Sequence, residues 1–207
     1  MKKEFKVISE LILQNSKVLD VGCGDGELMK FLKDNKITKI RGLEISKNRV
    51  QNCLSKGLTV IEGNAENDLQ QFPNNSFDFV ILSQTLQAFL DPEKVISELL
   101  RVGKKAIVTI PNFGYWKVRL NLLIKGTMPV TENLPNEWYN TPNLHMCTLR
   151  DFFNFCSKRE IKIFKSLALK NDKTLNLSAK NLAWRNLESQ LGIFLINKRK
   201  LILILIS

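Results

Sequence analysis

Residues 18–26 read VLDVGCGDG, a short apolar run that leads directly into three glycines spaced two residues apart. The run predicts a β-strand over Lys17–Val21, and the apolar spacing that follows predicts a helix over Gly26–Asn35. Glycine lets the chain turn sharply between the two elements and leaves backbone N–H groups clear for a ligand. The stretch therefore predicts a strand–turn–helix unit that binds a small molecule.

The same alternation of strand and helix continues as far as Pro111. Further strands are predicted over Lys39–Glu44, Leu58–Glu62, Phe77–Leu82 and Ala106–Ile110, and further helices over Pro92–Arg101 and over a segment that Ser46 caps and that runs to Leu54. Strands separated by helices of about ten residues form right-handed βαβ units. The fold class is therefore α/β, with a doubly wound, mostly parallel sheet.

The last third of the chain adds further elements to this sheet. A helix over Leu149–Lys158, capped by Thr148, is followed by predicted strands over Glu160–Leu169 and Leu191–Lys198. We therefore expect a seven-stranded sheet in a single domain that covers residues 1–207. The apolar tail, residues 201–207, begins with six aliphatic residues that either pack on the sheet or form an exposed, adhesive end.

Between these parts, residues 112–147 do not continue the alternation of strands and helices, and they are rich in glycine, proline and large aromatic residues. Long irregular segments within a compact domain are usually functional or disordered. Tyr115, Trp116, Trp138 and Tyr139 favour an ordered, cap-like insertion, in which 118–124 extends as a helix. Three interpretations stay open: the insertion covers the core, closes over a small acceptor molecule, or forms a docking face for a partner.

The overall composition is that of an ordinary soluble domain, with 207 residues, 44% hydrophobic and 25% charged. No run of about 18 apolar residues is present, so no membrane-spanning helix is expected. The first ten residues, MKKEFKVISE, lack the apolar region of a signal peptide. The four cysteines include no CxxC pair, and His145 is the single histidine, so we expect reduced thiols, no metal site and a cytoplasmic protein.

The net charge of +11 arises entirely in the second half of the chain. Residues 104–207 hold 17 of the 31 basic residues but only 6 of the 20 acidic ones. Such a basic half suits a nucleic acid, an acidic partner, an anionic substrate or simply a solvated lysine-rich face. No aromatic RNA-binding signature, zinc-finger spacing or helix-turn-helix is present, so nucleic-acid binding is not expected.

Polar side chains lie where the predicted strands end. Asp20 precedes the glycine turn, Glu44 ends the next strand, and Ser83 follows the strand over Phe77–Leu82. In an open α/β sheet, ligands bind in the crevice beyond the carboxyl ends of the strands, where a carboxylate can accept from both ribose hydroxyls. The negative charge of Asp20 would repel the pyrophosphate of a dinucleotide, so these residues favour a cationic ligand.

The glycine turn resembles motif I of the class I S-adenosylmethionine-dependent methyltransferases, which have a Rossmann-like fold. The resemblance implies S-adenosylmethionine or S-adenosylhomocysteine as the ligand, with its amino-acid part over Gly22 and Gly24 near Asp20. It also implies that Glu44 binds the ribose and that Asn64 and Ala65 line the adenine. Many members carry Asp at the Asn64 position. The full set of expected contacts is Asp20, Gly22, Cys23, Gly24, Gly26, Glu44, Ile45, Asn64, Ala65 and Ser83.

A closer resemblance, over roughly residues 7–170, is to the MetW family of methionine biosynthesis. It rests on FDFVILSQTLQ at 77–87, ELLRVG at 98–103, PNFGYW at 111–116, MPVT at 128–131 and LPNEWYNTPN at 134–143. This family is associated with MetX-type homoserine O-acyltransferases and is thought to support their activity. The resemblance therefore implies an accessory protein with such an acyltransferase as its partner.

An alternative hypothesis is a methyltransferase that acts on a small molecule. Methyl transfer needs an aligned acceptor and often a base. His145 is the only histidine, but its neighbours Leu144 and Met146 favour a structural role. No catalytic residue is assigned, and whether the protein is an enzyme stays open at this point.

Overall fold

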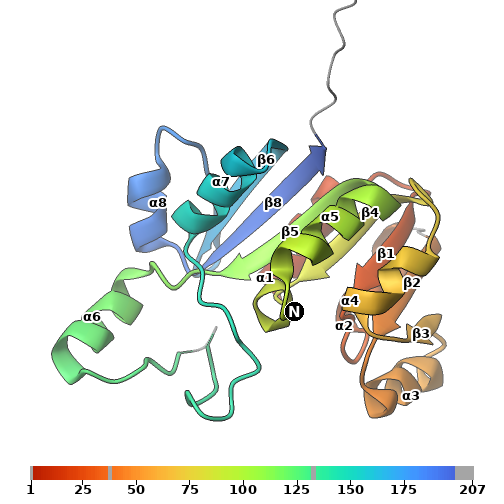
Figure 1. Cartoon of the computed structure of the whole chain (residues 1–207), viewed down its shortest axis with the longest axis horizontal. Helices are drawn as coiled ribbons and strands as arrows, with labels where there is room; N and C mark the ends of the chain where they lie inside the picture. The colour runs from red at the N-terminus through yellow and green to blue at the C-terminus, as the bar shows by residue number, and fades with distance from the viewer. Residues whose placement is uncertain (1, 37–38, 132–133, 199–207) are drawn as a thin grey trace, which may run out of the picture.

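The computed structural model describes residues 2–36, 39–131 and 134–198 and shows an eight-stranded sheet with helices on both faces (Figure 1). The strands are β1 Lys17–Val21, β2 Lys39–Glu44, β3 Val60–Glu62, β4 Phe77–Ser83, β5 Gly103–Pro111, β6 Ile161–Lys170, β7 Lys173–Asn176 and β8 Leu191–Lys198. Their order is β3-β2-β1-β4-β5-β8-β6-β7. The first five run parallel, whereas β8 lies antiparallel between β5 and β6.

The doubly wound, mostly parallel sheet is confirmed, and every predicted strand is present with bounds shifted by a few residues at most. The sheet has one strand more than the expected seven, because β7 pairs antiparallel with β6. Asn171 and Asp172 form the two-residue turn between them, and Asn171 has φ 51°. Asparagine tolerates this left-handed conformation, which is typical of tight hairpins.

Two helical layers cover the sheet. One face carries α1 Lys3–Leu11, α2 Glu27–Lys36 and α3 Lys47–Ser55, and the other carries α4 Ala65–Asp68, α5 Pro92–Val102, α7 Leu149–Lys158 and α8 Leu182–Glu188. Short 3₁₀ turns, η1 Leu69–Gln71 and η2 Leu86–Ala88, precede β4 and α5. The central strands β4 and β5 are buried on both faces, which explains their continuous apolar runs.

Residues 112–147 are here called the arm, and its described part, 112–131 and 134–147, contains α6 Trp116–Lys125 and otherwise irregular chain. Figure 1 shows α6 standing away from the sheet, and Val118 is its one buried residue. Trp138 and Tyr139 are largely exposed, so these rings do not cover the core. In the described part of the arm, Tyr115 is buried, whereas the side chains of Trp116, Trp138 and Tyr139 are exposed to solvent.

The buried Asn112 fastens the start of the arm to the domain. Its Nδ2 donates to the carbonyl oxygens of Asn186 (2.8 Å) and Ser189 (2.7 Å), and its Oδ1 accepts from the backbone N–H groups of Gly114 and Leu149. Within the described ranges, no helix is long and apolar enough to cross a bilayer. The tail at 201–207 lies outside the described residues.

Candidate functional site

The glycine turn after β1 leaves open space at one position. Gly22, Gly24 and Gly26 all adopt positive φ angles, which favour glycine. A Cβ at Gly22 would come within 2.7 Å of the Thr85 Cγ2 atom, whereas a Cβ at Gly24 would meet no atom within 4 Å beyond its chain neighbours. A ligand can therefore approach the backbone most closely at Gly24.

Glu44, at the end of β2, lies against this turn. Its Oε2 accepts from the backbone N–H of Gly24 and its Oε1 from that of Ser46, each at 2.9 Å. The side chain is buried, but each carboxylate oxygen keeps a second lone pair that can accept from a hydroxyl. The structure thus brings Glu44 and Gly24, two of the predicted ligand contacts, together.

Asp20 lies one residue before the end of β1 and is only 2% exposed. No hydrogen bond to its carboxyl group occurs among the described residues. Burial, followed by the nearby charges of Glu4 and Glu44, raises the pKa of Asp20 to about 8. A buried carboxyl group of this kind is suited to a cationic partner.

Glu4, near the start of α1, is a site residue that the sequence reasoning missed. This buried carboxylate accepts from the hydroxyls of Ser83 (2.8 Å) and Thr109 and from the side-chain amide of Gln84. Apolar residues at 5, 8 and 12 have the spacing of a helix and could have revealed α1. Nothing in the local sequence shows that this helix carries Glu4 to the ends of β4 and β5.

Asp20, Glu44 and Glu4 form what we call the carboxylate cluster. None of these three carboxyl groups forms a salt bridge with another described residue. Three acidic groups at the carboxyl ends of the central strands, none of them in a salt bridge within the described residues, suit a positively charged ligand. Hydroxyl groups of the same ligand can donate to Glu44.

The remaining predicted contacts lie around this cluster. Ile45 follows Glu44 and is 65% exposed, so it presents an apolar surface beside the turn, and Ala65 is buried at the start of α4. The Oδ1 of Asn64 accepts from the N–H of Glu66 and caps α4, which leaves the Nδ2 of Asn64 for a ligand. Burial raises the pKa of Cys23, so its thiol stays protonated at neutral pH.

Comparison with known proteins connects this geometry to a family. A family model described as methionine biosynthesis protein MetW matches residues 2–196. The bifunctional methionine biosynthesis protein MetXA/MetW of Rhodopirellula baltica is 33% identical over 153 residues, which cover 70% of this chain and 25% of that protein. A demethylmenaquinone methyltransferase of Listeria welshimeri is 30% identical over 134 residues, which cover 58% of this chain and 56% of that protein. The chain thus spans between a quarter and about half of the length of these relatives.

Solved structures share the fold. An S-adenosylmethionine-dependent methyltransferase from Thermotoga maritima superposes with a TM-score of 0.69 at 20% identity, over 95% of this chain and 88% of that one. At this identity the likeness shows the Rossmann-like methyltransferase fold, and fold alone does not establish an activity.

Proposed function

The chain belongs to the family of methionine biosynthesis protein MetW, and from that premise we propose that it binds S-adenosylmethionine and activates a MetX-type homoserine O-acyltransferase. The observation that carries the proposal is the carboxylate cluster beside Gly24, which is buried and has no basic partner among the described residues. The proposal has two parts, a ligand and a partner, and each is supported by a different region of the molecule.

The residues present fit S-adenosylmethionine. This ligand carries a sulfonium, an ammonium, a ribose diol and an adenine ring, and its sulfonium supplies a transferable methyl group when it is bound. Asp20 and Glu4 would stabilise the positive groups, and Glu44 would accept from the ribose hydroxyls. Ile45 and Ala65 would contact the adenine. Because S-adenosylhomocysteine lacks the sulfonium charge, the cluster favours S-adenosylmethionine over this product.

The partner is supported by the relative from Rhodopirellula baltica, in which MetXA and MetW are parts of one protein. Fusion keeps two modules at a high effective concentration, which is expected of parts that act together. The same pairing would allow feedback regulation of the acyltransferase by S-adenosylmethionine, because this ligand is made from methionine, the end product of the pathway. Such feedback requires that the free and partnered protein bind the ligand with different affinity.

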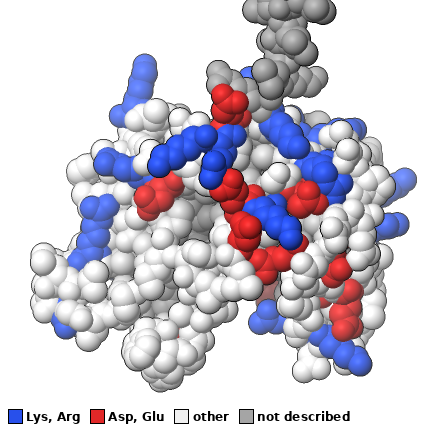
Figure 2. Space-filling view, viewed as in Figure 1, with Lys and Arg blue, Asp and Glu red and all other residues white. Residues whose placement is uncertain are grey.

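The arm is the surface that we assign to the acyltransferase. Its exposed large apolar residues are Trp116, Leu120, Leu122, Leu123, Ile124, Val130, Trp138, Tyr139, Leu144 and Met146. Figure 2 shows few charged side chains on this part of the molecule, at the lower left of the view. Extended exposed apolar surface marks interaction sites, and tryptophan and tyrosine are frequent anchors in them.

Co-purification with the cognate acyltransferase tests this docking face. We expect a stable complex with the unmodified chain and an affinity at least about tenfold lower for Leu123→Asp, since Leu123 is 82% exposed on α6. Leu13→Asp is the matched control, because Leu13 is 69% exposed outside the arm, and it should bind normally. Absence of a complex, or normal binding by Leu123→Asp, would contradict the assignment.

A second candidate function is methyl transfer to a small molecule. It is favoured by the similarity to a demethylmenaquinone methyltransferase and by the glycine turn that both functions need. Incubation of the protein with cell extract and methyl-labelled S-adenosylmethionine distinguishes the two. A labelled product that depends on the protein would favour the enzyme, whereas its absence, together with activation of the acyltransferase, would favour the accessory role.

The cellular location follows from the same proposal. Cys23, Cys53, Cys147 and Cys156 are all free thiols in the structure. Free thiols are typical of proteins in reducing compartments. We therefore propose the cytoplasm, where amino-acid biosynthesis would supply both the ligand and the partner.

A further inference from the structure

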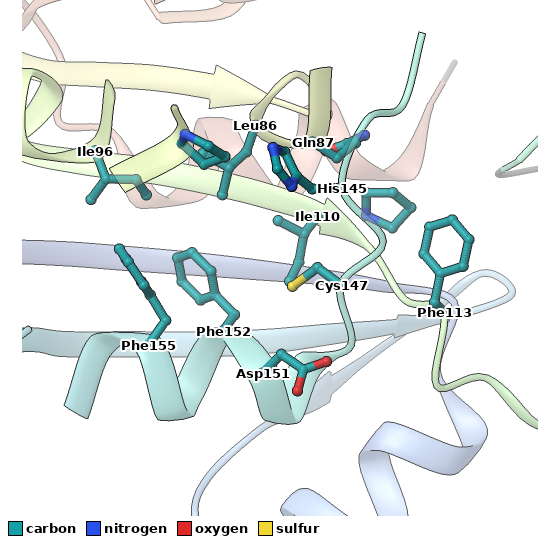
Figure 3. A pocket seen from close by; sticks show the side chains of 12 residues that line it. Leu86, Gln87, Ile96, Ile110, Phe113, His145, Cys147, Asp151, Phe152 and Phe155 are labelled. Carbon is teal, nitrogen blue, oxygen red and sulfur yellow. The ribbon is translucent and has the colours of Figure 1, made fainter. Parts of the chain in front are cut away.

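The carboxyl ends of the parallel strands carry the features described so far. The carboxylate cluster lies there and the arm begins there. An apolar cavity of about 170 Å³ lies at the same edge, between η2, the end of β5 and α7 (Figure 3). The opposite edge, where the parallel strands begin, has a different character. Four of its residues, here called the basic patch, are Lys105, Lys162, Phe164 and Lys165.

The strand register brings the basic patch together. Lys105, near the start of β5, pairs with Phe79 of β4. Lys162, near the start of β6, pairs with Asn197 of β8. Because β8 lies between β5 and β6, the two lysines flank it at the same level. The Nζ atoms of Lys105 and Lys162 lie 5.7 Å and 4.8 Å from the centre of the Phe164 ring.

A β-bulge directs two consecutive side chains of the patch outward. The register of β6 against β8 shifts between Ile163 and Lys165, so Phe164 is an extra residue in the strand. A bulge re-aims side chains that regular alternation would place on opposite faces. Phe164 is 47% exposed, and Lys165 is exposed as well. The helices therefore leave an aromatic ring and its neighbouring lysines in contact with solvent.

The positive charge of the basic patch is available to a partner. None of its lysines forms a salt bridge with another described residue. An ammonium group beside an aromatic ring is attracted by the ring but keeps its full charge. The combination of such groups with an exposed phenylalanine suits a partner surface that is both anionic and apolar.

The sequence that follows the last strand adds a second signal at the same edge. β8 ends at Lys198, which pairs with Ile161 at the start of β6 (Figure 1). Residues 198–200 read KRK, and residues 201–206 form the aliphatic run LILILI. The strength of peripheral membrane binding rises with the apolar area that is buried and with the attraction of basic residues to anionic lipids. The composition after β8 therefore has both properties that such binding requires.

We propose that the basic patch binds the surface of a bilayer that contains anionic phospholipids, with its lysines at the headgroups and the aliphatic run at the boundary with the acyl chains. A contact of this kind needs no membrane-spanning helix. A nucleic acid would use the lysines but not the aliphatic run. Because the patch lies opposite the carboxylate cluster, a bound protein would leave that cluster open to solvent. The proposal does not depend on S-adenosylmethionine or on the acyltransferase.

Co-sedimentation of the full chain with lipid vesicles tests the proposal. One set of vesicles contains phosphatidylcholine alone, and the other contains phosphatidylcholine and anionic phosphatidylglycerol in equal parts. At low ionic strength we expect at least about tenfold tighter binding to the anionic vesicles, and this preference should shrink as salt is added. No binding to the anionic vesicles, or equal binding to both kinds, would overturn the proposal.

Charge reversal locates the contact. Lys162→Glu/Lys165→Glu should bind the anionic vesicles at least about tenfold more weakly than the unmodified chain. The matched control is Lys117→Glu/Lys125→Glu, which makes the same change in net charge at two exposed lysines of α6. This control should bind normally, and circular dichroism should show both variants folded. Normal binding by Lys162→Glu/Lys165→Glu, or an equal loss in the control, would contradict the assignment.

A third variant separates a lipid surface from a nucleic acid. Leu203→Ser/Leu205→Ser keeps every charge but interrupts the aliphatic run, and it should bind anionic vesicles at least about tenfold more weakly. Unchanged vesicle binding by this variant, together with tight binding of a single-stranded RNA homopolymer by the unmodified chain, would identify a nucleic-acid surface and overturn the proposal.

Discussion

At the scale of single residues, Glu44 is the residue through which we propose that the fold contacts the ligand. Its carboxylate accepts from two backbone N–H groups, those of Gly24 and Ser46, and still has lone pairs for ribose hydroxyls. In Glu44→Gln, one of those N–H groups faces an NH₂ group and loses its acceptor. We expect an affinity for S-adenosylmethionine lower by at least about tenfold and a free energy of unfolding lower by about 1–3 kcal/mol.

Calorimetric titration and urea denaturation measure these two effects. The control is Glu62→Gln, because Glu62 pairs in register with Glu44 at the end of the neighbouring strand β3 and is exposed. This control should leave both quantities unchanged. An unchanged affinity in Glu44→Gln would remove Glu44 from the binding site.

Asp20 gives the free protein a characteristic dependence on pH. Burial, Glu4 and Glu44 raise its pKa from 3.8 to about 8 in the folded state. Between these values the folded protein holds a proton that the unfolded chain has lost, so stability falls as the pH rises from about 4 to 8. Denaturation at a series of pH values should show this slope in the unmodified protein and a smaller one in Asp20→Asn. Equal slopes would show that Asp20 does not titrate in this way.

At the scale of elements, the turn between β1 and α2 is proposed to bind the ligand, and a comparison of Gly24 in this turn with Gly57 outside it tests that role. Gly24 and Gly57 both have positive φ, 57° and 70°, and a Cβ at either would meet no atom within 4 Å beyond its chain neighbours. Replacement of either by alanine should cost about 1–2 kcal/mol of stability through backbone strain. We expect only Gly24→Ala to weaken the binding of S-adenosylmethionine as well, measured by calorimetry. Equal affinity in both variants would mean that the ligand does not approach Gly24.

The elements that sequence reasoning predicted are those whose signals are local. Apolar runs fixed the positions of β1 to β5, and capping residues such as Thr148 marked helix starts. The missed helices and strand, α1, α4, α8 and β7, are short or depend on packing for their order. The site was only partly predictable for the same reason: Asp20 and Glu44 lie at the ends of predicted strands, whereas Glu4 joins them through the tertiary placement of α1.

For the arm, the sequence did not predict which aromatic side chains are buried and which are exposed. Its aromatic residues predicted order, but Trp138 and Tyr139 could equally have been core residues, and only the structure shows them exposed. The type of a side chain predicts how much surface area it can bury. The surface against which it packs is determined by the whole fold or by another protein.

At the scale of the whole molecule, hydrogen bonds connect the carboxylate cluster to the arm. The side chain of Gln84 donates to Glu4, its carbonyl accepts from Gln87, and the carbonyl of Gln87 accepts from the N–H groups of Leu144 and His145. The proposed ligand at the cluster and the proposed partner on the arm would therefore act on one connected set of contacts. Coupling between two such sites is a free energy that must be measured on the assembled system.

The direct measurement is homoserine acylation by the purified cognate acyltransferase, with and without this protein, across a series of S-adenosylmethionine concentrations. We predict that the protein increases the rate, that S-adenosylmethionine changes the size of the increase, and that Glu44→Gln loses this ligand dependence while it still activates. A rate that the protein leaves unchanged at every ligand concentration would contradict the accessory role.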